Sequence, residues 1–412
     1  MLKKYRKHIL VITQYFYPET FRINDMTKEW VKRGYKVTVL TGIPNYPMGK
    51  FFEGYDLTHK RREKWNGVNI IRIPLIPRGS SQNKIINAIG MSANYFSFVV
   101  SGWLWKNLNN VKADLVYSYE VSPMTQVLVG VWYSKKHHIP HYVYVTDLWP
   151  ENVETVTGIH NKLIIGTIQK MVDYTYKNST RIFTCSNSFI SRIEKRGINR
   201  KKIEFWPQYA EDFYRPVEKK GDLLPQDGII NLVFAGSVGY AQGLNILVEA
   251  SKHLRKAGVK VRFDIIGDGR YLEQLQKDIK KASVQEYFHF VSRQPAEEIP
   301  NYFAYADVLL ITLSKSDVFS ITLPAKTPSC FACGKPVLVS ADGEIQDIVK
   351  EAEAGMCSDA EDVNAFVNNI IKFMDLSPEE REQMGRNALQ YANKYFDKEK
   401  QMNRLDDVFS QN

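Results

Sequence analysis

The run His8-Ile9-Leu10-Val11-Ile12-Thr13 near the start of the chain is apolar almost throughout and has the length of one strand. A strand without polar alternation is typical of a parallel sheet that is buried on both faces. A predicted helix follows at residues 25–34, with Asp25 as its cap and Gly34 as its stop, and Tyr35–Thr41 is a second predicted strand. This order predicts a doubly wound α/β sheet, in which ligands bind at the carboxyl ends of the strands.

The same pattern starts again in the second half of the chain. Ile229–Ala235 is predicted to be a strand, and Gly236–Gly243 is a glycine-rich loop that opens a predicted helix. Residues 203–216, which contain Trp206 and two prolines, are predicted to form a linker. A chain of 412 residues is also too long for one ordinary core. We therefore expect two α/β domains, at residues 1–205 and 206–394, and a C-terminal helix at 395–412 that packs back on the first domain.

The stretch Leu323-Pro324-Ala325-Lys326-Thr327-Pro328-Ser329 marks a candidate anion site. It leads into a short apolar helix that ends at Gly334, and proline before a helix with glycine after it is the usual pattern at helix ends. A helix N-terminus carries unpaired N–H groups and a partial positive charge, to which Lys326 would add a full charge. A diphosphate is the expected ligand, and a lysine on a solvated loop is the alternative.

The charge of the chain points to a polyanionic partner. The net charge is +10 and the basic runs, such as Lys60-Arg61-Arg62, lie in the first half. Nucleic acid, an anionic membrane and a phosphorylated substrate all fit this charge. The sequence contains no basic recognition helix and no aromatic–basic RNA motif, which argues against nucleic acid.

The cysteines favour neither a disulfide framework nor a metal site. The four are scattered, and the one C-x-x-C pair, Cys330 and Cys333, lacks a second pair of ligands. We interpret these two as small core residues. The absence of a recognisable signal peptide and the use of cysteine fit a reducing cytoplasm.

Residues 85–105 contain no charged side chain, although Lys84 and Lys106 flank them. The length could span a bilayer. However, the asparagines, serines and glycines make the segment too polar, while its aromatic residues and flanking lysines fit a helix that lies in the membrane interface. A helix buried against the sheet and a spanning helix are the alternatives.

Taken in chain order, several motifs resemble glycosyltransferase family 4, and more narrowly the WbuB-like members that assemble O-antigen and capsular repeat units on a lipid carrier. The resemblance covers nearly the whole chain. It implies the GT-B architecture, in which two Rossmann-like doubly wound domains face a central cleft. The motifs that carry the resemblance are residues 14–25, Pro44-Asn45-Tyr46-Pro47, Asp147-Leu148-Trp149-Pro150, residues 236–243, Gly267-Asp268-Gly269 and residues 324–336.

The resemblance implies a donor site in the second domain. Lys326 matches the lysine that binds the donor diphosphate. The turn with Gly236, Ser237 and Gly239 matches the turn whose amides lie near the phosphates. Glu344 would contact hydroxyls of the donor sugar, with a helix-capping role as the alternative.

The chain also departs from the family pattern on the donor side. Many members carry two glutamates seven residues apart, and aligned on Lys326 these positions hold Ile321 and Ser329. The Ser329 hydroxyl can still bind a ribose, and a small hydroxyl residue there resembles the WbuB-like members. Arg270 or Lys277 would lie near the base or the diphosphate, and the residues alone do not choose between them.

The resemblance places the acceptor in the first domain. Asp147 would orient or deprotonate the acceptor hydroxyl, and the alternative is an aspartate that only caps a turn. Glu19, Arg22 and Asn45 would line the acceptor side.

The expected function is therefore that of a retaining glycosyltransferase in O-antigen or capsule assembly. It would move a sugar, expected to be an N-acetylated amino sugar, from a UDP-sugar to a polyprenyl-diphosphate-linked saccharide. No metal or other cofactor is expected, and the protein would lie in the cytoplasm at the inner face of the plasma membrane. A nucleotide-sugar 2-epimerase of the same fold and a non-catalytic partner subunit are the alternatives.

Overall fold

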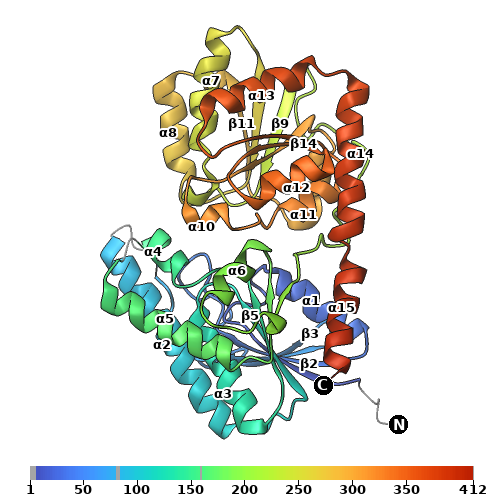
Figure 1. Cartoon of the computed structure of the whole chain (residues 1–412). Helices are drawn as coiled ribbons and strands as arrows, with labels where there is room; N and C mark the ends of the chain where they lie inside the picture. Colours follow the sequence, from blue (N-terminus) through green and yellow to red (C-terminus); the bar gives the residue numbers. More distant parts are fainter. Residues whose placement is uncertain (1–5, 80–83, 158–159, 412) are drawn as a thin grey trace. The chain divides into compact units, whose positions relative to one another are not determined.

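The computed structural model describes residues 6–79, 84–157 and 160–411. The chain divides into two compact units, residues 1–206 with 409–412, and residues 207–408. Each unit is built on one sheet with helices packed against it (Figure 1). The prediction of two doubly wound α/β domains is thereby confirmed.

The first unit holds an eight-stranded sheet in the order β3-β4-β2-β1-β5-β6-β7-β8. Neighbouring strands are parallel except β3 and β4. The chain starts in the middle, builds outward on one side and then returns to β5, so the loops after β1 and β5 flank the topological switch point. The strands are β1 (His8–Ile12), β2 (Lys36–Gly42), β3 (Arg62–Trp65), β4 (Val68–Ile73), β5 (Leu115–Glu120), β6 (His141–Val145), β7 (Arg181–Thr184) and β8 (Ile203–Phe205).

Two local predictions for the first unit are corrected. Helix α1 begins at Arg22 with Phe21 at its N-cap, so Asp25 is not the cap but lies in the first turn, where its charge still suits the helix dipole. The predicted linker begins with strand β8, because residues 203–205 pair with β7. The helices are α1 (Arg22–Lys32), α2 (Lys84–Leu108), α3 (Val127–His137), α4 (Glu151–Thr157), α5 (Lys162–Lys177) and α6 (Ser188–Glu194).

The second unit holds a six-stranded parallel sheet in the order β11-β10-β9-β12-β13-β14. Alternate residues of its central strands enter two separate cores, one on each face, as a doubly wound sheet requires. Strands are added on one side of β9 up to β11 and then on its other side from β12, so the loops after β9 and β12 flank the switch point of this unit. The strands are β9 (Ile230–Ala235), β10 (Val261–Ile266), β11 (Phe288–Val291), β12 (Val308–Thr312), β13 (Val337–Ser340) and β14 (Gly355–Ser358).

The helices of the second unit include the short one predicted after Lys326. It runs from Thr327 to Ala332, and Gly334 follows it with a φ of +66°. The helices are α7 (Asn245–Lys256), α8 (Leu272–Ala282), α9 (Ile299–Phe303), α10 (Asp317–Ser320), α11 (Thr327–Ala332), α12 (Glu344–Ala352), α13 (Val363–Asp375), α14 (Pro378–Tyr395) and α15 (Lys398–Ser410).

The end of helix α15 clusters with the first unit, whereas residues 395–408 cluster with the second. The Phe409 ring lies 5.1 Å from that of Tyr142 and 6.0 Å from that of Trp30, measured between ring centroids. Within the described ranges, none of the helices combines the length and the apolarity that crossing a membrane would need.

Candidate functional site

In the second unit, the loops after β9 and β10 pack backbone against backbone. A Cβ on Gly267 would lie 1.9 Å from the carbonyl oxygen of Gly236, and one on Gly269 would lie 2.2 Å from that of Val238. The Val238 N–H donates to the Asp268 carbonyl at 2.9 Å. Because only glycine permits this approach, the two loops form one surface at the carboxyl ends of β9 and β10.

Lys326 reaches this surface from the segment between β12 and β13. Its Nζ lies 3.5 Å from the centroid of the Phe234 ring, and a Cβ on Gly236 would lie 3.5 Å from the same Nζ. The amine is buried and has no hydrogen-bond partner in the described part of the chain. Burial lowers the pKa of Lys326 to about 7. An uncompensated buried cation beside a glycine loop at a switch point is the strongest sign of an anion site in this unit.

Helix α11 offers this site fewer amides than the sequence suggested. The Thr327 N–H donates to the Pro324 carbonyl, and the Cys330 N–H donates to the Lys326 carbonyl. Pro328 has no N–H at all. The helix N-terminus therefore offers fewer unpaired N–H groups than expected, and Lys326 supplies the full positive charge of this site.

The other donor-side candidates lie at different distances from the glycine loop. Ser237 is exposed on it, and Gly239 has extended backbone angles and would tolerate a Cβ with nothing closer than 4.0 Å. Arg270 is exposed and follows Gly269 directly. Lys277 lies in the second turn of α8 and pairs with Glu273 at 2.6 Å.

Two further candidates lie in helices of the same unit. Ser329 is buried in α11, three residues after Lys326. Glu344 is the first residue of α12 and is half-buried, while Gly343 occupies the N-cap with a φ of +86°. Glu344 is therefore not itself the helix cap.

In the first unit, Glu19 joins the loops that follow β1 and β2. Its carboxylate accepts the N–H groups of Asn45 at 2.8 Å and Tyr46 at 2.7 Å, and also that of Phe16 at 3.2 Å. Burial raises the pKa of Glu19 to about 7, although these hydrogen bonds oppose the shift. Asn45 is also buried, and its Oδ1 accepts the Arg78 N–H at 3.1 Å. Both side chains hold the loops after β1 and β2 in place.

Asp147 follows β6 at the carboxyl edge of the same sheet. It is half-buried, and its Oδ2 accepts the Ser122 N–H at 2.7 Å from the loop after β5. Its own N–H donates to the Glu120 carboxyl at 3.2 Å. Burial raises the pKa of Glu120 well above its usual value, and the nearby Asp147 adds to the effect. A half-buried carboxylate at the end of a strand can accept a hydrogen bond from a substrate hydroxyl or take its proton.

A group of aromatic side chains that was not predicted from the sequence lies at this edge. The Tyr15, Phe21 and Tyr46 rings lie 5.4–5.6 Å apart, and the Arg78 guanidinium lies 5.6 Å from the centroid of the Tyr46 ring. Arg22 begins α1 next to this group, and its charge acts on Tyr144. The tyrosines that follow β1 and β2 in the sequence were the signal that could have predicted this group.

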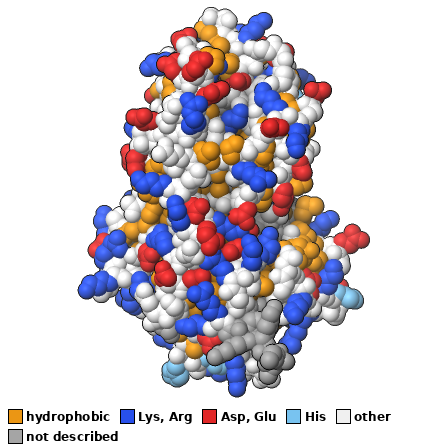
Figure 2. All heavy atoms as spheres, turned by 90° about the vertical axis from the view of Figure 1, so that its right-hand side faces the viewer, with side chains coloured by type: hydrophobic (Ala, Val, Ile, Leu, Met, Phe, Trp, Pro, Cys, Tyr) orange, Lys and Arg blue, Asp and Glu red, His pale blue; other side chains and the backbone are white. Residues whose placement is uncertain are grey.

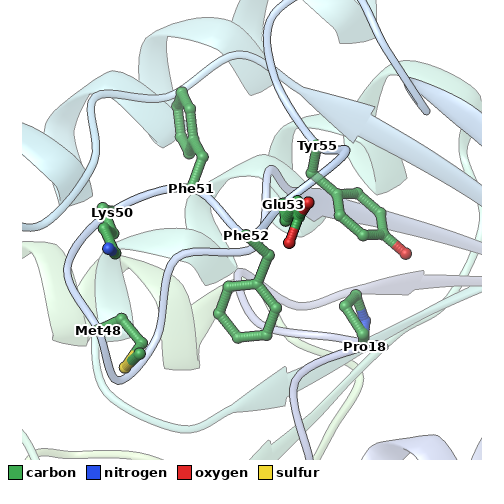
Figure 3. Close-up of a pocket in the computed structure, with 7 residues that line it drawn as sticks. All are labelled: Pro18, Met48, Lys50, Phe51, Phe52, Glu53 and Tyr55. Atoms are coloured by element: carbon green, nitrogen blue, oxygen red, sulfur yellow. The ribbon is translucent and has the colours of Figure 1, made fainter.

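A pocket of about 540 Å³ opens beside the same loops (Figure 3). Its walls are mostly apolar, with Lys50 and Glu53 as the charged groups, and the volume is within the usual range for small-molecule sites. The lining residues are Pro18, Met48, Lys50, Phe51, Phe52, Glu53 and Tyr55.

Among the described residues, no cluster of three or more His, Cys, Asp or Glu side chains could hold a metal ion. Cys330 and Cys333 are buried, and burial raises the pKa of the Cys330 thiol to about 12. Their interpretation as core residues is confirmed.

Comparison with known families assigns both halves of the chain. Residues 21–208 match the family described as Glycosyltransferase Family 4, and residues 218–391 match Glycosyl transferases group 1. Together the two matches cover most of the chain.

Individual proteins are similar over the full length. The putative colanic acid biosynthesis glycosyl transferase WcaI of Escherichia coli K12 is 23% identical, over 95% of this chain and 97% of WcaI. Among solved structures, sucrose-phosphate synthase from Thermosynechococcus elongatus has a TM-score of 0.77 at 14% identity, over 98% of this chain and 99% of that one. Anabaena HepE in complex with UDP and glucose has a TM-score of 0.70 at 14% identity, over 99% and 100%. The expected GT-B fold is thus confirmed, and the chain is a glycosyltransferase that carries a Glycosyltransferase Family 4 domain followed by a Glycosyl transferases group 1 domain.

Proposed function

We propose that this glycosyltransferase moves a sugar from a nucleotide-diphosphate donor to a lipid-linked saccharide in the assembly of a bacterial surface polysaccharide, with retention of the anomeric configuration. The observation that carries the proposal is the buried, unpartnered amine of Lys326 against the Gly236 loop. WcaI, which is similar over nearly its whole length, is described as a colanic acid biosynthesis enzyme.

The proposed chemistry places the departing charge at Lys326. The bond from the sugar C1 to the donor diphosphate breaks, and a bond from C1 to the acceptor hydroxyl oxygen forms on the same face. The hydroxyl proton passes to an oxygen of the leaving phosphate, with Asp147 holding the hydroxyl in place. Lys326 binds the diphosphate in its charged form and stabilises the negative charge that develops there. In this proposal the protein's own cations carry that role without a metal.

The donor is proposed to be a UDP-sugar, with an N-acetylated amino sugar as the group transferred. HepE, which shares the fold, has been solved with UDP and glucose. In this chain, Ser329 stands near Lys326 with a hydroxyl that can bind a ribose.

The acceptor side is proposed to work at the inner face of the plasma membrane, in contact with a polyprenyl-diphosphate-linked saccharide. Helix α2 supports this, because one face of it exposes apolar side chains every three or four residues while Asn94 and Phe98 are buried on the other. Lys106 lies beside this face, with its Nζ 6.0 Å from the Trp103 ring centroid. Such a helix fits a membrane interface. The exposed residues are Ile86, Ile89, Phe96, Val100, Trp103, Leu104 and Leu108.

The proposal is tested by transfer with purified protein. UDP-N-acetylglucosamine, UDP-glucose and GDP-mannose are offered in turn with a lipid extract that contains undecaprenyl-diphosphate-linked sugars. We expect one nucleoside diphosphate to be released, and only in the presence of the extract. We also expect the new glycosidic bond to have the same anomeric configuration, axial or equatorial, as the donor sugar.

Two results would contradict transfer. Conversion of the donor sugar to its 2-epimer without acceptor would identify an epimerase. Binding of no nucleotide by the folded protein would favour a non-catalytic partner subunit.

A further inference from the structure

Arg78 is a half-buried cation without an acidic partner among the residues that the structure describes. Its Nη2 donates to the Met91 thioether at 2.9 Å, and its Nε is buried with no hydrogen-bond partner there. A thioether is a weak acceptor. By contrast, the buried Arg72 and the half-buried Arg196 of the same unit pair with Glu63 at 3.0 Å and with Glu151 at 3.2 Å. Since charges inside proteins are normally compensated, Arg78 is prepared for an anion that is not part of this unit.

Two tyrosines accompany this cation. The guanidinium lies against the Tyr46 ring, which is partly exposed and is supported by Tyr15. The charge of Arg78 also acts on the hydroxyl of the half-buried Tyr95, which helix α2 contributes. The planar guanidinium and phenol hydroxyls together match the oxygens of a phosphoryl group.

The site is built before any ligand arrives. Asn45 Oδ1 accepts the Arg78 N–H, and Glu19 holds Asn45 and Tyr46 by their own N–H groups. Groups from the loops after β1, β2 and β4 and from α2 therefore meet at one edge of the sheet. The charge of Asp147, after β6, acts on the same Tyr95 hydroxyl.

The surroundings of Arg78 favour a lipid phosphate over a free phosphate as the ligand. Ile76, two residues before it, is 53% exposed, and Met48, two residues after Tyr46, is 59% exposed. On helix α2, Ile89 is exposed beside Gly90, where an added Cβ would lie 2.6 Å from the Arg78 carbonyl oxygen. A cation bordered by exposed apolar side chains suits a ligand in which a phosphoryl group joins a hydrocarbon chain.

We propose that Arg78, with the hydroxyls of Tyr46 and Tyr95, binds the diphosphate of the lipid-linked acceptor. This inference rests on the proposed function, since it assigns the part of the acceptor that the acceptor site must hold. The acceptor sugar then extends toward Asp147, whose negative charge keeps the diphosphate on the Arg78 side.

The test is calorimetric titration of the full-length protein with farnesyl diphosphate. The donor site is first saturated with whichever nucleoside diphosphate binds, so that the second diphosphate reports a separate site. Farnesol and inorganic diphosphate are titrated in parallel. Arg78→Met removes the cation, and Arg62→Met removes an exposed cation of the same unit as a matched control. Arg78→Lys keeps the charge without the planar fork and carries the test if Arg78→Met does not fold.

We expect farnesyl diphosphate to bind the wild type and Arg62→Met equally, and Arg78→Met at least tenfold more weakly, with Arg78→Lys between them. Farnesol should bind too weakly to measure. Equal binding by the wild type and Arg78→Met, or equal losses in both arginine variants, would overturn the inference. Inorganic diphosphate that binds as tightly as farnesyl diphosphate would assign the site to a free anion instead. If no nucleoside diphosphate binds in the first step, the proposed function fails, not this inference alone.

Discussion

The buried amine of Lys326 makes the stability of the free protein depend on pH in a defined direction. Its pKa is lowered to about 7, against about 10.4 for an unfolded lysine. Between these values the unfolded chain binds more protons, so the contribution of Lys326 to stability rises with pH, and below pH 7 its penalty is fully present. We predict that Lys326→Met raises the melting temperature at pH 6.5 and that the gain shrinks by pH 10.

Scanning calorimetry of the free protein measures this difference. Lys256→Met, at an exposed position in α7, is the control and should show no such dependence on pH. A gain for Lys326→Met that is the same at both pH values would mean that burial does not lower the pKa of this amine.

Arg270 and Lys277 carry the same charge, but their surroundings differ. Arg270 adjoins the glycine contact between the β9 and β10 loops, whereas Lys277 is already paired on the surface of α8. We predict that Arg270→Ala weakens nucleotide binding several-fold and that Lys277→Ala changes it by less than about twofold, because an exposed ion pair contributes about 0–1 kcal/mol. Fluorescence titration with a labelled nucleotide measures both, and the reverse order would contradict the placement.

At the scale of residues, Lys326 could be predicted from the sequence, whereas Arg78 could not. Lys326 follows a proline turn before a helix, a local pattern that is visible in the chain. Arg78 matters because its buried Nε has no hydrogen-bond partner among the described residues, and only the tertiary fold determines that. Two of the three N–H groups that donate to the Glu19 carboxylate, those of Asn45 and Tyr46, likewise come from a loop that is distant in sequence.

At the scale of elements, two glycines separate two roles of the loops after β9 and β10. One glycine leaves space beside the backbone, and the other allows two backbones to approach closely. Gly239 has room for a Cβ, whereas a Cβ on Gly269 would collide with the Val238 carbonyl. We predict that Gly239→Ala keeps the melting temperature but weakens nucleotide binding, since a methyl group would occupy the space of a phosphate. Gly269→Ala should lower both.

Thermal unfolding and nucleotide titration of the two variants check this prediction. Unchanged binding by Gly239→Ala would show that no phosphate approaches this turn.

Helix α2 gives a second prediction for an element. Replacing Phe96 and Trp103, both exposed, by serine removes apolar surface from one face of the helix without touching its buried side. We predict that this double variant binds vesicles of phosphatidylglycerol several-fold more weakly than the wild type in a sedimentation assay, because interfacial binding scales with buried apolar area. Leu57→Ser, at another exposed apolar position of this unit, is the control. Equal binding by all three proteins would remove α2 as the membrane contact.

The elements themselves were predictable where periodicity and helix-end signals agreed. The buried strands β1, β2 and β9 and the end of α11 followed from apolar runs and glycines. The start of α1 did not, because tertiary packing extends the helix past Asp25 to an uncapped Phe21. The amides of α11 were overestimated because the turn at Pro324 uses one of them.

At the scale of the whole molecule, the repeated strand–helix pattern predicted two sheets but not their charge distribution. On the face in Figure 2, Lys and Arg side chains are interspersed with Asp and Glu. The basic side chains behind the net charge of +10 therefore do not form one continuous patch on that face. The sites depend instead on single uncompensated cations at the sheet edges, Lys326 in one unit and Arg78 in the other.

The central claim is that Lys326 binds the diphosphate of a nucleotide donor, and calorimetry with UDP, GDP, ADP and TDP tests it most directly. The titrations use the wild type, Lys326→Ala and the surface control Lys256→Met, with EDTA present. We predict that one nucleotide binds the wild type and the control equally. The same nucleotide should bind Lys326→Ala at least tenfold more weakly, since a charge-assisted contact contributes about 1.5–3 kcal/mol. Equal affinity of all three proteins for that nucleotide, or no binding by the folded wild type, would contradict the claim.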